Sequence, residues 1–456
     1  MRTEQFDVIV VGGGTGGTFA AATAAREGLD VVLLERKPES EAGHIACGDA
    51  IKGANTFPDV IDREYLRAES FTNDGIERAL FELPDGEQIE YSFGGQSGAI
   101  LDRKRYGEVL LEEADRAGAT IQYDTVVQDV VQTDGVIDGV VATRDGAQYQ
   151  YEAPVTIDAA GALSILQDRA DFEGATFDTN VDYTHFCSAY REVLSVDEPV
   201  SYDDALVFKP TEELGYLWYF PRTATEINVG LGFQMSEEPM QLVETLREEL
   251  RAKPEFERAT VEDKLGAALP TRRPYDSAVS PGYLAVGDAA AHVNPTTGGG
   301  IPGAAKAGHW AGEVAVDAVV EESVDEATLW TYNHRVQTDF GKRFAAMDLY
   351  NIFGTTHSIQ ELTDVIASLP AQQLIDVLGK EGTASMSLLG KARLALSTFG
   401  HWGTLYDAYR VNAMADELKA IYEQYPTTPA AFSDWQHDRD AFMDRFYDYV
   451  GAEPKY

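Results

Sequence analysis

Basic residues and cysteine are both scarce in this chain. Its 456 residues include 36 Lys and Arg against 76 Asp and Glu, which gives a formal charge of −40 at pH 7. So acidic a surface repels a phosphate backbone, and we expect no nucleic-acid partner. Cys47 and Cys187 are too few for a disulfide framework. A packed apolar core must therefore stabilise the fold, and the hydrophobic content of 44% is sufficient for one.

The acid excess is spread along the chain rather than gathered in one segment. At high ionic strength the repulsion among these acids is screened and costs little. We therefore predict a salt-adapted protein with an acidic, solvated surface. The alternative is an acidic face that docks a partner.

The chain also lacks a secretion signal and a convincing membrane span. The first residues, MRTEQFDVIV, contain no basic segment followed by an apolar stretch. Residues 8–25 carry no charge and are long enough to cross a membrane. Five glycines between 12 and 17 interrupt this run, however, and predict a turn. We expect a cytoplasmic protein.

A nucleotide-binding pattern is present at the start of the chain. Residues 7–11 predict a buried strand, the glycine turn follows, and 18–27 predict a helix. The next strand, 30–35, ends in Glu35, near the spacing expected for an acid that accepts from ribose hydroxyls. A glycine turn lets the backbone approach a pyrophosphate at a helix N-terminus. The pattern predicts dinucleotide binding, with an ordinary glycine-rich connection as the alternative.

A second glycine-rich segment follows the strand predicted at 283–286. That strand ends in Gly287 and Asp288, and glycines at 298–300 open a helix over 301–320. No strand directly precedes these glycines, and Pro302 simply starts the helix, so we assign no second dinucleotide site. Asp288 can instead hold a ribityl chain, while the helix N-terminus faces the electron-rich edge of a flavin.

The remaining patterns predict an α/β fold with a second sheet. Residues 75–100 indicate a hairpin with its turn at 84–86, 121–131 a strand, and 181–234 antiparallel strands. We expect a Rossmann-like FAD-type domain, a hairpin that joins an antiparallel-sheet substrate domain, and a helical C-terminal region. In chain order these parts are 1–74, 75–100, 101–170, 171–265, 266–325 and 326–456.

In combination these motifs resemble the flavin fold of p-hydroxybenzoate hydroxylase. Within that superfamily the chain is similar to the geranylgeranyl reductase family. Residues 216–221, Tyr-Leu-Trp-Tyr-Phe-Pro, followed after eight residues by the Gly-Leu-Gly of 230–232, resemble the signature of that family. Residues 46–48, Ala-Cys-Gly, resemble its cysteine motif. The resemblance covers about residues 5 to 325, and the C-terminal third matches only in helical character.

The resemblance implies tightly bound FAD and reduction of isoprenoid double bonds, typically in archaeal ether-lipid precursors. No metal is implied. Many relatives carry an arginine where this chain has Gln167, which leaves the role of that position open. The chain shows no second nucleotide domain, so ferredoxin or NAD(P)H would dock transiently as electron donor. The implied FAD contacts are Gly12, Gly14, Gly16, Gly17, Glu35, Ala46, Cys47, Gly48, Arg103, Val127, Asp288, Gly300 and Ile301.

The implied reaction needs a proton donor, because an isolated trisubstituted alkene accepts hydride poorly. Cys47 is the catalytic candidate, since a thiol near the flavin could donate or relay that proton. Tyr216, Trp218 and Phe220 alternate onto one face of their strand, where aromatic rings could stabilise a developing cation in the substrate. The alternatives are a plain sheet core for these aromatics and a packing role for Cys47. We assign Cys187 to the core.

Three long segments of this acidic chain contain no acid: 8–26, 289–312 and 382–406. The first two carry the glycine motifs. The third is apolar, with Lys391 and Arg393 as its charges. It predicts the wall of a lipid tunnel and peripheral membrane contact through the two bases, or else a buried core helix.

Three other functions share these features. The substrate could be a prenyl quinone or a carotenoid side chain. The protein could be a flavin monooxygenase of the same fold, or a flavin-bearing isoprenoid carrier without turnover.

Overall fold

The protein is described by a computed structural model covering residues 2–52, 57–83, 86–211, 214–235, 240–368 and 402–456. Its centre is a six-stranded sheet, parallel except for the pairing of its last strand, β19. Because strands of this kind are covered on both faces, they read as continuous apolar runs. In spatial order the strands are β19 (Val279–Ser280), β20 (Tyr283–Ala285), β13 (Val155–Asp158), β2 (Val8–Val11), β3 (Val31–Leu34) and β9 (Thr120–Gln122).

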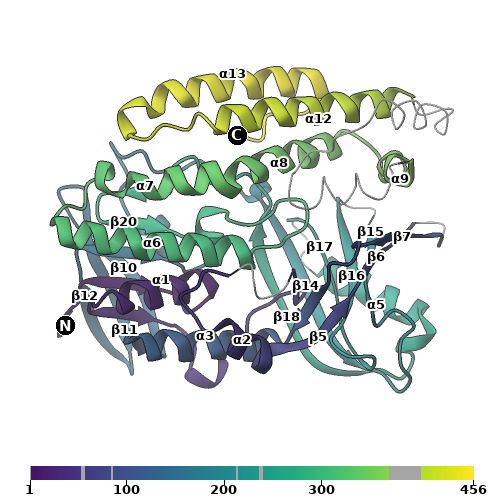
Figure 1. Cartoon of the computed structure of the whole chain (residues 1–456), viewed down its shortest axis with the longest axis horizontal. Helices are drawn as coiled ribbons and strands as arrows, with labels where there is room; N and C mark the ends of the chain where they lie inside the picture. Colours follow the sequence, from purple (N-terminus) through teal and green to yellow (C-terminus); the bar gives the residue numbers. More distant parts are fainter. Residues whose placement is uncertain (1, 53–56, 84–85, 212–213, 236–239, 369–401) are drawn as a thin grey trace.

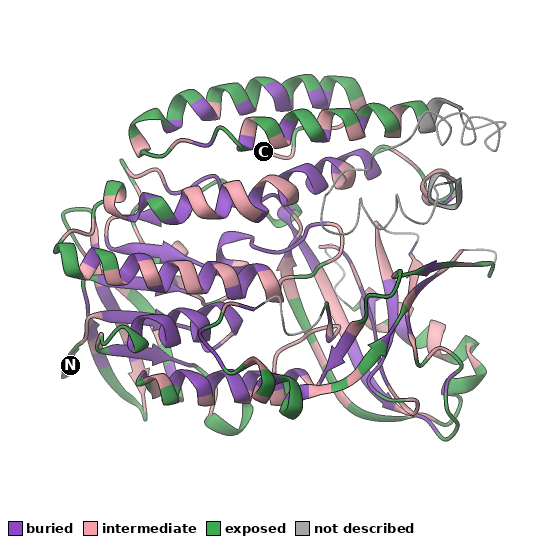
Figure 2. Ribbon diagram, viewed as in Figure 1, coloured by how far each residue is buried: buried purple, intermediate pink, exposed green. Residues whose placement is uncertain are grey.

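Four helices lie side by side against this parallel sheet (Figure 1). Helix α1 (Thr15–Arg26) is buried along nearly its whole length (Figure 2). It packs closely against α6 (Ile301–Glu321), since a Cβ on Gly308 of α6 would lie 2.0 Å from the Gly16 carbonyl oxygen of α1. In spatial order the helices are α3 (Arg103–Ala117), α1 (Thr15–Arg26), α6 (Ile301–Glu321) and α7 (Glu326–Val336).

A four-stranded sheet also belongs to this half of the molecule. The single strand predicted over 121–131 is wrong: it divides into β9 and β10, which belong to different sheets. The chain turns between them at Asp124, which has a φ of +50°. In spatial order the strands are β1 (Arg2–Gln5), β12 (Ala147–Glu152), β11 (Val136–Arg144) and β10 (Thr125–Thr133).

The second large sheet has seven strands and is antiparallel except where β6 meets β15. The hairpin predicted within 75–100 is confirmed as β6 and β7. The last strand, β18, runs beyond residue 265, where the predicted domain division lies. The strands are β18 (Thr260–Pro270), β14 (Phe186–Ser195), β17 (Glu226–Gln234), β16 (Gly215–Pro221), β15 (Ala205–Pro210), β6 (Arg78–Glu82) and β7 (Gln88–Ser92).

Shorter elements join the two halves. A three-stranded sheet contains β4 (Ala50–Ile51), β8 (Gly98–Leu101) and β5 (Phe71–Ile76). Three further helices precede the C-terminal region: α2 (Arg63–Ser70), α4 (Ile165–Arg169) and α5 (Gln241–Ala252). The 3-10 turns are η1 (Glu39–Glu41), η3 (Tyr183–His185), η4 (Pro254–Phe256), η5 (Gly287–Ala290) and η7 (Pro429–Ala431).

The described residues beyond 326 are helical, as predicted, and α12 and α13 form the outermost layer in Figure 1. Among the residues the structure describes, no helix is long and apolar enough to cross a membrane. Residues 402–406 of the segment 382–406 begin α12, whereas residues 382–401, which include Lys391 and Arg393, lie outside the described part. The remaining helices are the π-helical η6 (Gln337–Gly341), α8 (Lys342–Gly354), α9 (Ile359–Ser368), α12 (Trp402–Tyr422) and α13 (Phe432–Val450).

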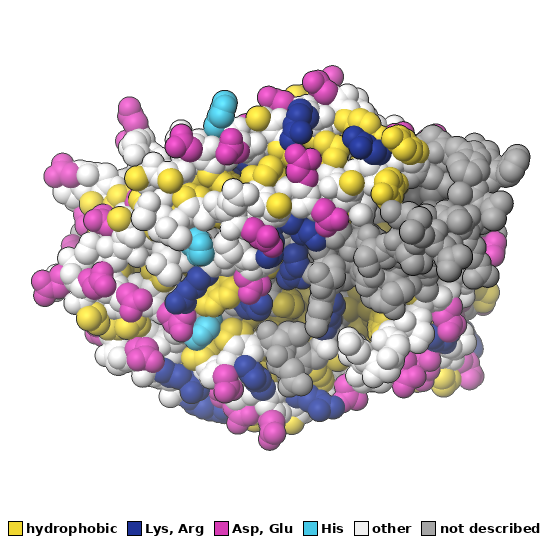
Figure 3. All heavy atoms as spheres, turned by 45° about the horizontal axis from the view of Figure 1, so that its top comes forward, with side chains coloured by type: hydrophobic (Ala, Val, Ile, Leu, Met, Phe, Trp, Pro, Cys, Tyr) yellow, Lys and Arg dark blue, Asp and Glu magenta, His cyan; other side chains and the backbone are white. Residues whose placement is uncertain are grey.

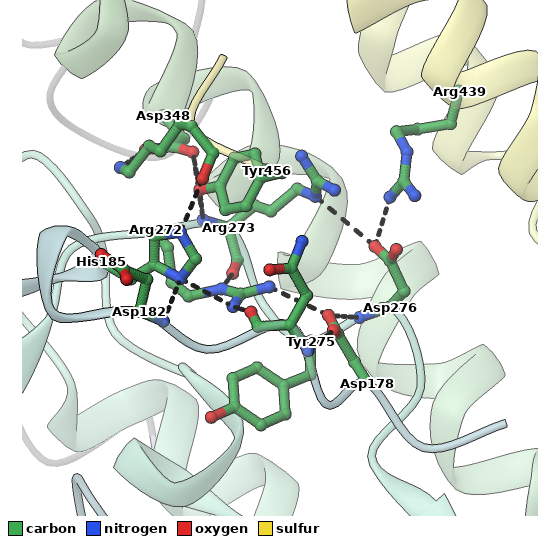
Figure 4. Close-up of polar contacts among 12 residues, drawn as sticks. Asp178, Asp182, His185, Arg272, Arg273, Tyr275, Asp276, Asp348, Arg439 and Tyr456 are labelled. Carbon is green, nitrogen blue, oxygen red and sulfur yellow. Dashed lines mark hydrogen bonds and ion pairs between the residues drawn. The ribbon is translucent and has the colours of Figure 1, made fainter. Parts of the chain in front are cut away.

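A polar junction ties these C-terminal helices to the two sheets (Figure 4). Arg272 Nη2 donates to Asp178 at 2.9 Å, and Arg439 of α13 pairs with Asp276. Tyr456 donates to Asp348 of α8. Burial of this kind makes breaking one pair costly, by about 3–5 kcal/mol, so the junction fixes the helices over the site described next.

Candidate active site

A cavity of about 2930 Å³ opens between the parallel sheet, the seven-stranded sheet and the C-terminal helices. Its lining includes every predicted cofactor residue except Gly17, together with the three predicted substrate aromatics. Gly17 lies outside the lining but allows the turn to pack closely, since a Cβ there would lie 2.0 Å from the Gly12 carbonyl oxygen. The structure thus brings together residues that are up to 289 positions apart, Gly12 and Ile301.

The cavity lining is not acidic, unlike the chain as a whole. Its described part contains eight Lys or Arg and six Asp or Glu, whereas acids outnumber bases by 76 to 36 overall. In Figure 3 acidic side chains are spread over the visible face, and some of the Lys and Arg side chains lie near its centre beside hydrophobic atoms. Such a lining suits a ligand that combines anionic groups with a long apolar part.

The first glycine turn forms an open cradle at the N-terminus of α1. Gly12 adopts a φ of +106°, and a Cβ on it would lie 2.3 Å from the Ala159 carbonyl oxygen. A Cβ on Gly14 would instead have its nearest neighbour 3.9 Å away, so the cavity side is free. No acid lies in the first turn of α1, and its amide groups can therefore bind a pyrophosphate.

Glu35 lies beside this turn, as its spacing predicted. Its two carboxylate oxygens accept from the backbone N–H of Gly13 at 2.8 Å and of Lys37 at 2.9 Å. These bonds orient a buried carboxylate along the cavity wall, where it retains lone pairs for ribose hydroxyls.

Asp288 and Arg103 place polar side chains in the cavity that a cofactor can bind. Burial raises the pKa of Asp288 to about 6, although the charge of Arg103 acts to lower it. Arg103 is 5% exposed, and its Nη1 has no hydrogen-bond partner among the described residues. An acceptor for ribityl hydroxyls and a buried cation for phosphate oxygens are both what FAD needs, so the residues present fit this cofactor.

The loop that carries Cys47 is fixed to the seven-stranded sheet at both ends. His44 Nε2 lies 2.8 Å from Asp263 Oδ2 on β18. At the other end Asp49 accepts from Arg222 Nη2 at 2.6 Å and from Asn228 Nδ2 at 2.7 Å. Cys47 is therefore held rigidly in the cavity wall.

The Cys47 thiol is in its protonated form at neutral pH. Burial raises the pKa of Cys47, and the Asp49 carboxylate raises it further, against the opposite effect of Arg103. The backbone N–H of Asp49 donates to the sulfur at 3.2 Å, so the sulfur accepts while its own proton stays available. A thiol in this state can act as a general acid.

The predicted alternation of the three aromatics is confirmed. Tyr216 and Trp218 have ring centroids 6.0 Å apart, and Trp218 and Phe220 have centroids 6.2 Å apart, all on the cavity face of β16. Leu217 and Tyr219 point into the core on the other face. Trp218 and Phe220 are also buried, so they pack and line the cavity together.

The structure also shows the positions of Gln167 and Cys187. Gln167 donates from Nε2 to the Ala289 carbonyl oxygen at 2.6 Å and to Asp158 at 3.3 Å, which joins the two strand ends of the flavin-type fold. Cys187 is buried on β14, as assigned, and also reaches the cavity.

Asp49, which lines the cavity, forms a group with Arg222 and Asn228 that was not predicted from the sequence. Asp49 directly follows the cysteine motif, and Asn228 precedes the Gly-Leu-Gly stretch by two residues. Proximity to both motifs was the available signal, but their pairing across 179 positions was not visible. Among the described residues, no cluster of His, Cys, Asp or Glu could hold a metal ion.

The fold and the cradle define an FAD-dependent oxidoreductase, and residues 7–173 match the family model described as FAD dependent oxidoreductase. The chain is 32% identical over 357 residues to the digeranylgeranylglycerophospholipid reductase of Methanothrix thermoacetophila, covering 76% of this chain and 87% of that protein. It belongs to this reductase family.

Two further comparisons extend over more of the chain. The digeranylgeranylglycerophospholipid reductase of Sulfolobus acidocaldarius is 26% identical over 454 residues, which covers 98% of this chain and 99% of that protein. The fold is similar to that of a geranylgeranyl bacteriochlorophyll reductase-like protein from Thermoplasma acidophilum. The TM-score is 0.70 at 21% identity, and the match covers 90% of this chain and 100% of that structure.

Proposed function

We propose that this protein uses FAD to reduce the C=C bonds of geranylgeranyl chains in archaeal ether-lipid precursors. The observation that carries the proposal is one cavity that contains a flavin-type cradle, a protonated thiol and a row of aromatic rings. The names of the relatives support the same substrate class. The mixed charge of the lining suits a phospholipid with an anionic head and apolar chains.

The side chains divide the work as follows. Bound FAD supplies the hydride. Glu35, Arg103 and Asp288 hold the cofactor, and Cys47 donates the proton that the other alkene carbon requires. Tyr216, Trp218 and Phe220 present ring faces to the carbon on which positive charge develops, an interaction worth about 0.5–2 kcal/mol.

The electron donor and the location belong to the same proposal. Reduction of the flavin falls to a ferredoxin or NAD(P)H that docks transiently. We propose a cytoplasmic enzyme that meets its lipid at the membrane surface. The parts named in the sequence analysis remain our proposed domain division, with the substrate sheet extended to the end of β18 at Pro270.

The direct test is a single turnover without oxygen. Protein with chemically reduced FAD is mixed with a digeranylgeranylglycerol phospholipid, and flavin absorbance and lipid mass are followed. We expect flavin reoxidation to coincide with the gain of two hydrogens per double bond. The fully saturated diphytanyl lipid serves as control and should leave the flavin reduced. A flavin that stays reduced with both lipids would overturn the proposal.

Two alternatives predict other outcomes of the same assay. A prenyl quinone reductase would oxidise the flavin faster with a menaquinone side chain than with the phospholipid. A monooxygenase would consume oxygen rapidly in the presence of NADPH and leave the lipid double bonds intact. The thiol in the cavity wall favours reduction over oxygen insertion, which needs no such donor, whereas the rates with the two lipids decide between the two reductases.

A further inference from the structure

Asp49 is the acid of the loop that carries Cys47, and burying its carboxylate costs free energy. Its side chain is fully buried and its φ is +70°. Removing a carboxylate from water costs several kcal/mol, which an ion pair only partly returns. Oδ2 accepts from Arg222 and Asn228, while Oδ1 has no hydrogen-bond partner among the described residues. Stability alone does not account for a half-paired carboxylate here.

Asp49 and Asn228 together hold Cys47 from two sides. The Asp49 N–H donates to the Cys47 sulfur at 3.2 Å, and Asn228 Nδ2 donates to the Cys47 carbonyl oxygen at 2.9 Å. Asn228 in turn accepts from Trp218 Nε1 at 2.9 Å. A Cβ on Gly48 would lie 3.1 Å from the ring of Phe220. The thiol is thus fixed relative to the aromatic row of β16.

Two cations act on this thiol in the opposite direction to Asp49. Burial, the largest effect, and the Asp49 carboxylate disfavour a thiolate, whereas Arg103, Arg191 and the hydrogen bond from the Asp49 N–H stabilise it. The phenols of Tyr106 and Tyr216 also interact with Cys47, and both remain neutral because burial raises the pKa of each. Loss of the Asp49 carboxylate would therefore favour the thiolate.

We infer that Asp49 is a positioning residue that keeps Cys47 a protonated thiol beside the aromatic row of β16. The role of Asp49 in catalysis rests on the proposed function, but the effect of Asp49 on the protonation of Cys47 does not. In turnover the S–H bond breaks as a C–H bond forms at one alkene carbon, and the other carbon takes the hydride supplied by reduced FAD. The thiolate then recovers its proton from water.

The test uses the full-length, FAD-loaded protein in a Cys187→Ser background, where Cys47 is the only cysteine. The rate of iodoacetamide alkylation is measured against pH by mass spectrometry, which needs no substrate. We expect Asp49→Asn to lower the midpoint of this titration by at least about one pH unit, a tenfold increase in thiolate fraction at fixed pH. Asp178→Asn removes another buried acid, paired with Arg272 at 2.9 Å, and should leave the midpoint unchanged.

A double variant keeps the test valid if Asp49→Asn does not fold. Asp49→Asn with Arg222→Gln replaces the ion pair by two amides and leaves no buried charge unpaired. It should lower the midpoint as well, because Asp49 rather than Arg222 acts on the thiol. An unchanged midpoint in every variant that folds and retains FAD would overturn the inference.

Turnover then separates this inference from the proposed function. If both hold, the alkaline limb of the single-turnover rate should move down by the same amount as the alkylation midpoint. A shifted midpoint with an unshifted rate profile would support the role of Asp49 and overturn Cys47 as the proton source. Rescue by Asp49→Glu should be incomplete, because the longer side chain cannot keep the 2.6 Å contact with Arg222 without moving the loop.

Discussion

Among single side chains, Cys47 allows proton donation to be separated from packing. A serine is nearly isosteric with cysteine but a far weaker acid, and an alanine keeps only part of the volume. If the thiol donates the proton, Cys47→Ser and Cys47→Ala should both slow lipid reduction by about 10²-fold or more. FAD content should stay near normal in both, as measured by absorbance after gel filtration. Alanine activity close to that of the unaltered protein would leave Cys47 a packing role only.

Asp288 should make the stability of the FAD-free protein depend on pH. Its pKa is raised by burial from 3.8 to about 6, so the folded state disfavours ionisation and loses stability as pH rises through that window. Asp288→Asn removes this penalty, worth at most about 3 kcal/mol. We expect the Tm of the FAD-free variant to exceed that of the unaltered protein increasingly between about pH 4 and 6, and the difference to level off above that.

The same substitution should weaken FAD binding by about tenfold, because the amide loses a charged acceptor for the ribityl hydroxyls. Asp339→Asn is the matched control: this acid also lines the cavity but lies in a half-exposed pair with Lys306. It should cost no more than about 1 kcal/mol and show no growing gain in Tm with pH. A Tm difference for Asp288→Asn that is flat over this range would contradict the assignment.

The limits of sequence reasoning follow from chain separation. Gly12, Glu35 and the strands around them are close in sequence, and their spacing alone predicts a cradle. No local pattern marks Asp49 and Asn228, because their hydrogen bond forms only where β17 packs against the loop that carries Cys47. Gln167 is similar, because its contact with Ala289 joins two motifs that the sequence presents separately.

Helices and strands were predictable where one pattern covers one element. The apolar run of β2 and the helix α6, opened by Gly300, match their predicted positions. The division of 121–131 into β9 and β10 was missed because both strands contain β-branched residues and only the turn at Asp124 separates them. The parallel pairing of β6 with β15 was invisible too, since nothing local specifies which strand a hairpin joins.

The packing of α1 on α6 yields a prediction about a helix pair. A Cβ on Gly308 would lie 2.0 Å from the Gly16 carbonyl oxygen, so Gly308→Val must push the two helices apart. Overpacking of this kind costs about 1–3 kcal/mol or more. Because the cradle lies at the start of α1 and Gly300 caps α6, FAD should be lost as well.

Thermal melting and FAD content of the purified variant measure both effects. Gly75→Ala is the control, since a Cβ there would find its nearest atom, on the Asn73 side chain, 3.4 Å away. It should retain FAD and melt within a few degrees of the unaltered protein. Full FAD content in Gly308→Val would show that α6 can shift without disturbing the cradle.

Across the entire chain, net charge sets the expected response to salt. Acids exceed bases by 40, so repulsion among them opposes folding at low ionic strength. Ion pairs on the surface, such as that between Arg67 and Asp74, favour folding but are worth only about 0–1 kcal/mol each. Salt weakens both effects, and the unpaired excess makes the loss of repulsion the larger one.

We therefore expect the Tm to rise steadily from dilute buffer to molar KCl. The Debye length falls from about 30 Å at 0.01 M to about 3 Å at 1 M, which confines each acid's field to its nearest neighbours. The buried pairs of the polar junction, Arg272 with Asp178 among them, are screened much less and keep the C-terminal helices in place. Tetramethylammonium chloride at equal ionic strength is the control, and it should raise the Tm similarly if screening is the cause. A Tm that is flat or falls with KCl would contradict a salt-adapted surface and favour the acidic face as a docking site for a partner.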